Sequence, residues 1–259
     1  MSIEAVDLHG EIVGEGPAVL LLHGFSHGLA YWRAQRAVLA QTHRLILADL
    51  RGHGQSPAPD AAYGHAEHLA DVVRLLDRQD VPCVHVIGTH TGAGVGLLMA
   101  LEHPDRVASL ILEGAVIPGA AMASVDDALA RERQITAEHG LDAARADWFT
   151  LPFFDGARRG AAADEMRTLI AEFSGVPWQI SHAPEPVRPV VGRLAEVRQP
   201  VALINGTEDL PEFLDVARLL ERSLPRVSRY AIPDAGCFAA WERPEAVTPL
   251  LVRILEEFD

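Results

Sequence analysis

One stretch of the chain, residues 81–103 (VPCVHVIGTHTGAGVGLLMALEH), constrains the fold more than any other. It opens with an apolar, largely β-branched run at residues 84–87, which is typical of a buried parallel strand. The chain then turns through Gly88-Thr89-His90-Thr91-Gly92. A helical apolar spacing follows at once, with Pro104 just beyond its end. The sequence therefore predicts a strand, a tight turn and a helix, with His90 at the centre of the turn.

Five further segments accompany this stretch, in an order that resembles the α/β-hydrolase superfamily. They are HGF at 23–25, DLRGHGQS at 49–56, HPDRV at 103–107, NGTED at 205–209, and DAGCF at 234–238 followed by WERPE at 241–245. The resemblance covers nearly the whole chain and identifies residues 81–103 with the nucleophile elbow of that family. It implies an α/β-hydrolase fold: a mainly parallel sheet with helices on both faces and an inserted helical cap.

The resemblance also implies three catalytic positions, and two of them hold unusual residues. The elbow normally presents serine, but here it presents His90; the base is normally histidine, but here it is Cys237. Only the acid, Asp209, is as expected. Because no histidine occurs after His182, none can replace the base locally. Hydrolysis through a seryl ester in its standard form is therefore not available to this chain. The family also implies an oxyanion hole made by the backbone amides of Phe25 and Thr91.

Several kinds of chemistry remain open for His90, Asp209 and Cys237. His90 could act as a general base or acid beside the oxyanion hole, which suits lyase, isomerase or cyclase-like reactions. Alternatively, Cys237 could be a nucleophile that His90 activates, as in a hydrolase or acyl transferase. The three residues could also bind a metal, or the chain could be an inactive member that only binds a ligand.

We favour the first hypothesis: a cofactor-independent enzyme that acts on a small, largely apolar carbonyl or ester-type substrate. Cys237 should be a poor nucleophile, because the negative charge expected at Asp209 opposes formation of a thiolate. Asp209 should then act on His90 directly or through a water, keeping it basic and oriented.

The domain boundaries follow from where strand and helix patterns alternate. Residues 1–117 and 190–259 alternate as an α/β core should, whereas residues 118–189 are helical in pattern and rich in aromatic residues. We predict that residues 118–189 form a cap inserted after the sixth strand, counting an edge hairpin at residues 3–14. The cap also contains His182, whose reach to the pocket the sequence does not decide. The expected substrate pocket is formed by Ser26, His27, Trp148, Phe149, Phe153, Phe154 and Trp178.

Composition limits the partners of the chain. The formal net charge is −14 and every basic residue is arginine, which argues against binding nucleic acid or an anionic membrane surface. Two cysteines, Cys83 and Cys237, are too few for a disulfide framework, and Cys83 should be a core residue. With no long apolar run and no leader-like N-terminus, we expect a cytoplasmic protein with a small-molecule substrate and no metal; a homodimer is left open.

Overall fold

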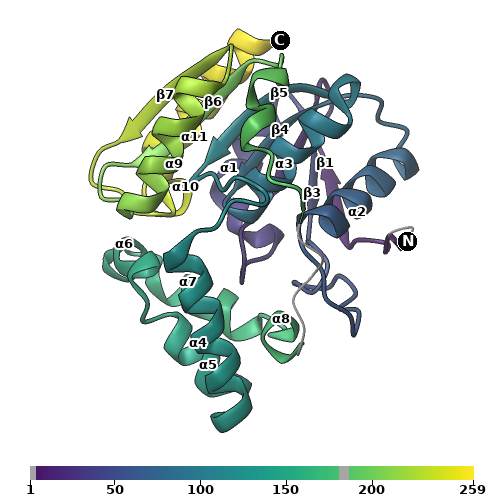
Figure 1. The fold of residues 1–259 in the computed structure, drawn as a ribbon. Helices are drawn as coiled ribbons and strands as arrows, with labels where there is room; N and C mark the ends of the chain where they lie inside the picture. Colours follow the sequence, from purple (N-terminus) through teal and green to yellow (C-terminus); the bar gives the residue numbers. More distant parts are fainter. Residues whose placement is uncertain (1–3, 181–186) are drawn as a thin grey trace.

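A seven-stranded sheet forms the centre of the computed structural model, which describes residues 4–180 and 187–259 (Figure 1). Its strand order is β1-β3-β2-β4-β5-β6-β7, with β1 antiparallel to β3 and every other pairing parallel. The strands are β1 (Gly10–Val13), β2 (Ala18–Leu22), β3 (Arg44–Ala48), β4 (Val84–Thr89), β5 (Val107–Glu113), β6 (Val201–Gly206) and β7 (Val227–Ile232).

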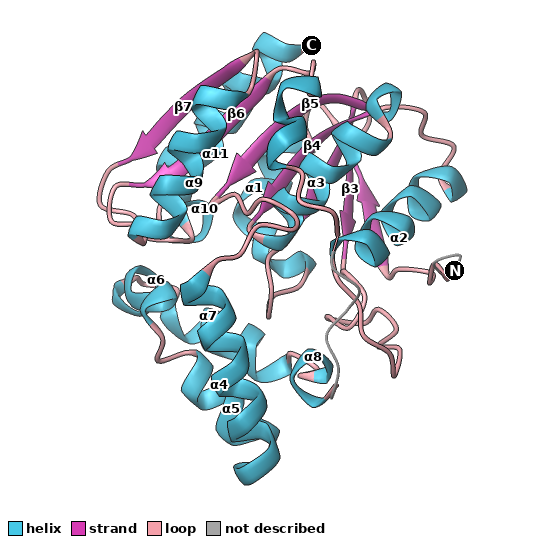
Figure 2. Ribbon diagram, viewed as in Figure 1, coloured by secondary structure: helices cyan, strands magenta, loops and turns pink. Residues whose placement is uncertain are grey.

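Helices cover both faces of this sheet, as the apolar runs of its strands require (Figure 2). Alternate residues of β2 point to opposite faces, so that Val19 and Leu21 join one core cluster while Leu20 and Leu22 join the other. The first face packs against α1 (Arg33–Leu39) and α11 (Pro244–Phe258), and the second against α2 (His65–Arg78) and α3 (Thr91–Glu102). The predicted class of fold is therefore observed.

Between β5 and β6, the described part of the chain is helical. Its elements are α4 (Ala123–His139), α5 (Leu141–Trp148), η3 (Pro152–Phe154), α6 (Asp155–Arg159), α7 (Ala163–Glu172), α8 (Val176–Gln179) and η4 (Val191–Glu196). Helices α4 to α8 gather beside the carboxyl ends of the parallel strands (Figure 1). His182, whose reach the sequence left undecided, lies outside the described residues. The remaining helices are η1 (Leu29–Trp32), η2 (Pro104–Arg106), α9 (Pro211–Ser223) and α10 (Ala239–Glu242).

Three predictions about the core were wrong. In the described part of the N-terminal region only residues 10–13 form a strand, and they pair with β3 rather than within a hairpin. The helical segment therefore follows the fifth strand, not the sixth. Cys83 is exposed, because it lies just before β4 begins and not within that buried strand.

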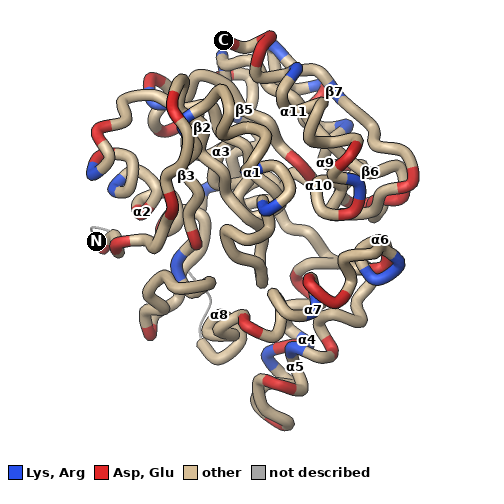
Figure 3. Tube along the Cα trace, turned by 180° about the vertical axis from the view of Figure 1, so that it is seen from behind, with Lys and Arg blue, Asp and Glu red and all other residues tan. Residues whose placement is uncertain are grey.

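Charged positions are distributed over the outer helices and loops, where acidic and arginine residues are mixed (Figure 3). One such pair, Arg131 Nε with Asp147 Oδ2 at 2.7 Å, joins α4 to α5. Among the described residues, none of the helices combines the length and apolar character needed to cross a bilayer.

Candidate active site

The turn between β4 and α3 adopts the strained geometry that its glycines predict. His90 has φ 47° and ψ −107°, in the region that residues other than glycine rarely adopt. A Cβ added at Gly88 would lie 2.5 Å from the carbonyl carbon of Gly92, and one at Gly92 would lie 2.4 Å from the carbonyl oxygen of Leu22. Glycine at both positions therefore allows strand and helix to approach closely, and His90 is held at the tip of the turn.

The imidazole of His90 is buried in apolar surroundings, and only one of its two nitrogens is hydrogen-bonded. Its Nδ1 lies 2.8 Å from the Thr89 hydroxyl, whereas Nε2 has no hydrogen-bond partner. The rings of Phe213 and Phe238 pack against it, with centroid distances of 5.0 and 4.9 Å. Burial lowers the pKa of His90 to about 3, so the side chain is neutral at physiological pH.

A buried carboxylate, Glu113 at the end of β5, lies on the far side of Thr89. Its Oε2 accepts a hydrogen bond of 2.8 Å from the Tyr31 hydroxyl, and its Oε1 accepts one of 2.6 Å from the Ala240 amide. Burial raises the pKa of Glu113 to about 7, and hydrogen bonding from these two groups and the Thr89 side chain opposes the rise. Thr89 therefore lies between a carboxylate and His90.

The other two positions of the expected triad, Asp209 and Cys237, interact with each other. Asp209 Oδ2 accepts from Asn205 Nδ2 at 2.8 Å, its Oδ1 accepts from the Leu210 amide at 2.8 Å, and the Cys237 thiol also donates to this carboxylate. Burial, and then the charge of Asp209, raise the pKa of the Cys237 thiol far above its usual range. In the described residues, His90 hydrogen-bonds to Thr89 and not directly to Asp209. The alternative, that Asp209 acts on His90 through a water, stays a prediction.

The two backbone amides proposed for the oxyanion hole remain available. Neither the Phe25 nor the Thr91 amide donates to a protein acceptor in the described part of the chain. Thr91 begins α3, where the helix dipole favours negative charge. Both residues also line the cavity next to His90.

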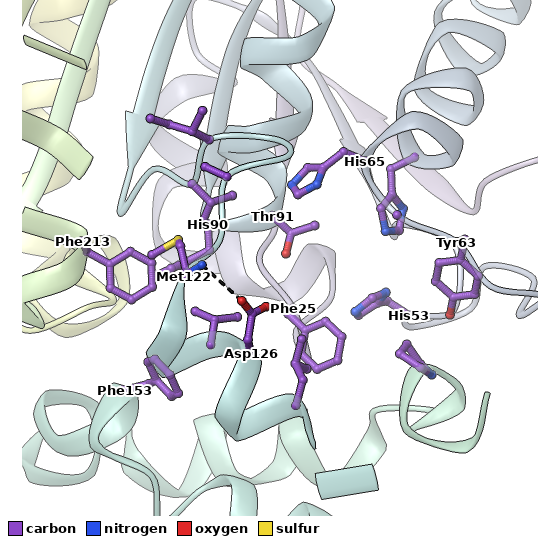
Figure 4. Close-up of a pocket in the computed structure, with 18 of the residues that line it drawn as sticks. Phe25, His53, Tyr63, His65, His90, Thr91, Met122, Asp126, Phe153 and Phe213 are labelled. Carbon is purple, nitrogen blue, oxygen red and sulfur yellow. Dashed lines mark hydrogen bonds between the residues drawn. The ribbon is translucent and has the colours of Figure 1, made fainter. Parts of the chain in front are cut away.

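A cavity of about 480 Å³ lies between the core and the helices that follow β5, and His90 forms part of its wall (Figure 4). Of the predicted pocket residues, Trp148, Phe153 and Phe154 line it. Met122, from the segment before α4, and Phe213, from α9, close the cavity around His90.

The other four predicted pocket residues are buried beside the cavity and do not line it. Ser26 Oγ accepts a hydrogen bond of 2.8 Å from Trp148 Nε1 and faces that indole. The His27 ring lies between Tyr31 and Phe238, at centroid distances of 5.2 and 4.9 Å. Aromatic neighbours also enclose the last two: Phe149 packs against Phe154 at 5.5 Å, and Trp178 against Phe173 at 5.0 Å.

Several residues that line the cavity were missed from the sequence: His53, Tyr63, His65, His68, Met122, Asp126, Arg133, Phe213 and Phe238. The sequence did contain a signal for two of them, because His65 and His68 are three residues apart and share a face of α2. His53 belongs to the DLRGHGQS segment, and the structure places it in the cavity wall. Phe238 follows Cys237 directly, and its ring lies beside that of His90.

The described residues do not form a candidate metal site. Across residues 4–180 and 187–259, no three His, Cys, Asp or Glu side chains are grouped so that they could hold a metal ion.

Comparison with known proteins agrees with this architecture. The family model described as the alpha/beta hydrolase fold matches residues 17–134. A putative carbamate hydrolase RutD of Variovorax paradoxus is 45% identical over 112 residues, which are 42% of this chain and 42% of that protein. The match thus spans less than half the length of that relative.

Two similarities extend over almost the whole chain. The putative carbamate hydrolase RutD of Azorhizobium caulinodans is 32% identical over 254 residues, covering 94% of this chain and 91% of that protein. The solved structure of a thermophilic esterase from Thermogutta terrifontis superposes with a TM-score of 0.83 at 24% identity, covering 97% and 93% of the two chains. The order of the strands, the strained turn at His90 and these similarities together show that the chain belongs to the α/β-hydrolase fold family.

Proposed function

We propose that this chain is a cofactor-independent enzyme that acts on a small, largely apolar carbonyl compound, with His90 as its general base and acid. The observation that carries the proposal is the state of the imidazole: Nδ1 is bonded to Thr89, the buried Nε2 is unpartnered beside Gly114, and His90 lines the cavity. An unpartnered nitrogen can take a substrate proton without first losing a hydrogen bond.

The hydrogen bonds around Thr89 support one tautomer of His90. A hydroxyl that donates to the Glu113 carboxylate has its oxygen lone pairs free to accept from Nδ1–H. The remaining lone pair of the imidazole is then on Nε2, as a base requires. Thr89 and Glu113 thereby orient His90, which is the role that the acid at Asp209 has in the family. Asp209 instead accepts a hydrogen bond from the Cys237 thiol.

The low pKa of His90 does not prevent this chemistry, because the product of the proton transfer is an ion pair. His90 Nε2 takes a proton from the carbon next to the carbonyl, and the C–H electron pair becomes an enolate. The enolate oxygen accepts hydrogen bonds from the Phe25 and Thr91 amides, and its charge stabilises the imidazolium formed beside it. Return of the proton to another atom, or loss of a leaving group, completes an isomerase or lyase reaction.

Hydrolysis is the second candidate, and the names of the relatives favour it, since two are putative carbamate hydrolases. In this case His90 would deprotonate a water that attacks the carbonyl, with the same two amides holding the oxyanion. We further propose that residues 118–189 act as a cap over His90, because Trp148, Phe153 and Phe154 from this segment line the cavity.

The test is exchange of the α-protons of apolar ketones in D₂O, followed by proton NMR, together with hydrolysis of 4-nitrophenyl esters. We expect the wild type to accelerate at least one of these reactions, and His90→Ala to lose about 100-fold or more of that rate. Ligand affinity should stay within about tenfold, because a base acts mainly in the transition state.

Two variants serve as controls for this experiment. Thr89→Val, which keeps the shape but removes the hydroxyl next to Nδ1, should lose about tenfold, whereas Cys237→Ser should retain most of the rate. A rate that survives in His90→Ala would overturn the assignment of the base. Tight binding of the ketones without any turnover would instead support an inactive, ligand-binding member of the fold.

A further inference from the structure

Polar side chains without partners gather at the end of the cavity opposite Phe213 and His90. They belong to His53, Tyr63 and His65, which lie at this end in Figure 4, and to His68, whose ring is next to those of His53 and Tyr63. We call these four side chains the polar end. Four buried atoms of these side chains have no hydrogen-bond partner: His53 Nε2, Tyr63 Oη, His65 Nε2 and His68 Nδ1. Phe25 and Thr91 lie between the polar end and His90 (Figure 4).

The polar end belongs to the interior of the protein and not to its surface. His53 is 1% exposed and His68 is 5% exposed. Ring centroids lie 6.3 Å apart for His53 and His68 and 5.6 Å apart for Tyr63 and His68. Buried polar groups usually have partners, so several unpartnered ones around a single cavity indicate that a ligand supplies them.

The polar end can both accept and donate hydrogen bonds. His53 Nδ1 lies 2.9 Å from the carbonyl oxygen of Arg51 and must donate to it, which leaves Nε2 as an acceptor. The Tyr63 hydroxyl can donate as well as accept. A ligand group that matches this end therefore has both kinds of atom, as a carboxamide does.

Charge at the polar end is small. Burial lowers the pKa of His53 to about 3 and that of His65 to about 4, so both rings are neutral at physiological pH. The buried guanidinium of Arg51, 5.8 Å from the centre of the Tyr63 ring, is paired with Asp71, whose Oδ2 lies 2.6 Å from Nε. An uncharged ligand group suits these surroundings better than an anion does.

We propose that His53, Tyr63, His65 and His68 form a subsite for an uncharged hydrogen-bonding group, such as a carboxamide, at the far end of the substrate. The substrate is then a two-ended molecule: a carbonyl at His90, an apolar middle against Phe25, and a polar group at the other end. The position of the carbonyl rests on the function proposed above, whereas the subsite itself does not.

The test compares three probes by isothermal titration calorimetry: 4-phenylbutan-2-one, its para-carboxamide and its para-carboxylate. We expect the carboxamide to bind wild type at least tenfold more tightly than the parent ketone, since each added hydrogen bond contributes about three- to tenfold. Tyr63→Phe and His53→Phe should each reduce this preference by about three- to tenfold, while the parent ketone binds within about twofold of wild type. Tyr230→Phe, a matched change on β7, should leave the preference intact.

The inference is overturned if the carboxamide binds no more tightly than the parent, if both variants keep the preference, or if none of the probes binds. Tightest binding by the carboxylate would also overturn it, because the subsite would then be one for anions. The subsite and the base chemistry can fail independently of each other. If the wild type prefers the carboxamide but accelerates neither α-proton exchange nor ester hydrolysis, the proposed base chemistry is wrong and the subsite still stands.

Discussion

At the scale of single residues, the surroundings of His90 and Cys237 differ. His90 lines a cavity and has one unpartnered nitrogen, whereas Cys237 is buried against Asp209. Both residues could be singled out from the sequence, because short motifs mark their positions in the fold. The hydrogen-bonded chain from His90 through Thr89 to Glu113 could not be predicted from the sequence. Thr89 is the neighbour of His90 in the chain, but Glu113 comes from the adjacent strand. Only the register of β4 against β5, which pairs Thr89 with Glu113, brings these two residues together.

The difference predicts that the two cysteines react at very different rates with iodoacetamide at pH 7.5. Alkylation requires a thiolate that the reagent can reach; Cys83 is exposed, while Cys237 is buried and its pKa is raised by burial and by Asp209. We expect Cys237 to react about 100-fold or more slowly than Cys83 in the native protein. Peptide mass spectrometry over time would measure both rates in one sample, and urea-unfolded protein gives the reference in which they converge. Equal native rates would restore Cys237 as a candidate nucleophile.

At the scale of elements, the apolar run at residues 84–87 predicted β4, because a buried parallel strand leaves a continuous pattern. The same reasoning could not select the cavity wall within residues 118–189. Phe149 and Phe153 are equally aromatic and only four residues apart, yet only Phe153 faces the cavity. Which of them does so depends on how α5 and η3 pack, and that packing depends on contacts with distant residues such as Ser26.

The contact between Ser26 and Trp148 gives a test of how α5 is attached to the core. Ser26→Ala would leave the buried indole N–H of Trp148 without its acceptor, at a cost of about 1–3 kcal/mol in the free energy of unfolding. Urea denaturation followed by tryptophan fluorescence would measure it. The matched change Ser228→Ala, at an exposed position of β7, should have little effect. If both variants lose the same stability, the hydrogen bond does not hold α5 in place.

At the scale of the whole molecule, the unusual feature is how many histidines are buried without charge. Burial lowers the pKa of seven of them: His23, His27, His53, His65, His68, His85 and His90. The sequence contains twelve histidines, but it does not show which of them are buried. It therefore could not show that several of them surround one cavity, since they come from separate loops and from α2.

These histidines should make the protein sensitive to mild acid. Their pKa is lower in the folded than in the unfolded chain, so their contribution to stability is present above about pH 6.5 and is lost as the pH falls. Carboxyls with a raised pKa act in the opposite direction: Glu113 at about 7, Glu132 at about 8, and Asp71, Asp209 and Glu242. The seven histidines outnumber these five carboxyls, so unfolding near pH 5.5 should take up protons on balance and stability should fall with acid.

Urea denaturation at pH 7.0, 6.0 and 5.5 would measure this dependence. The unfolding free energy should fall with increasing steepness across the series, because the unfolded histidines become charged while the folded ones do not. A His53→Phe, His68→Phe double variant keeps the aromatic packing but removes two of the seven histidines. It should therefore lose stability more gradually with acid than the wild type. A free energy that stays constant from pH 7.0 to 5.5 would mean that these histidines accept protons in the folded state. The polar end of the cavity would then carry positive charge in mild acid and would favour anionic ligands there.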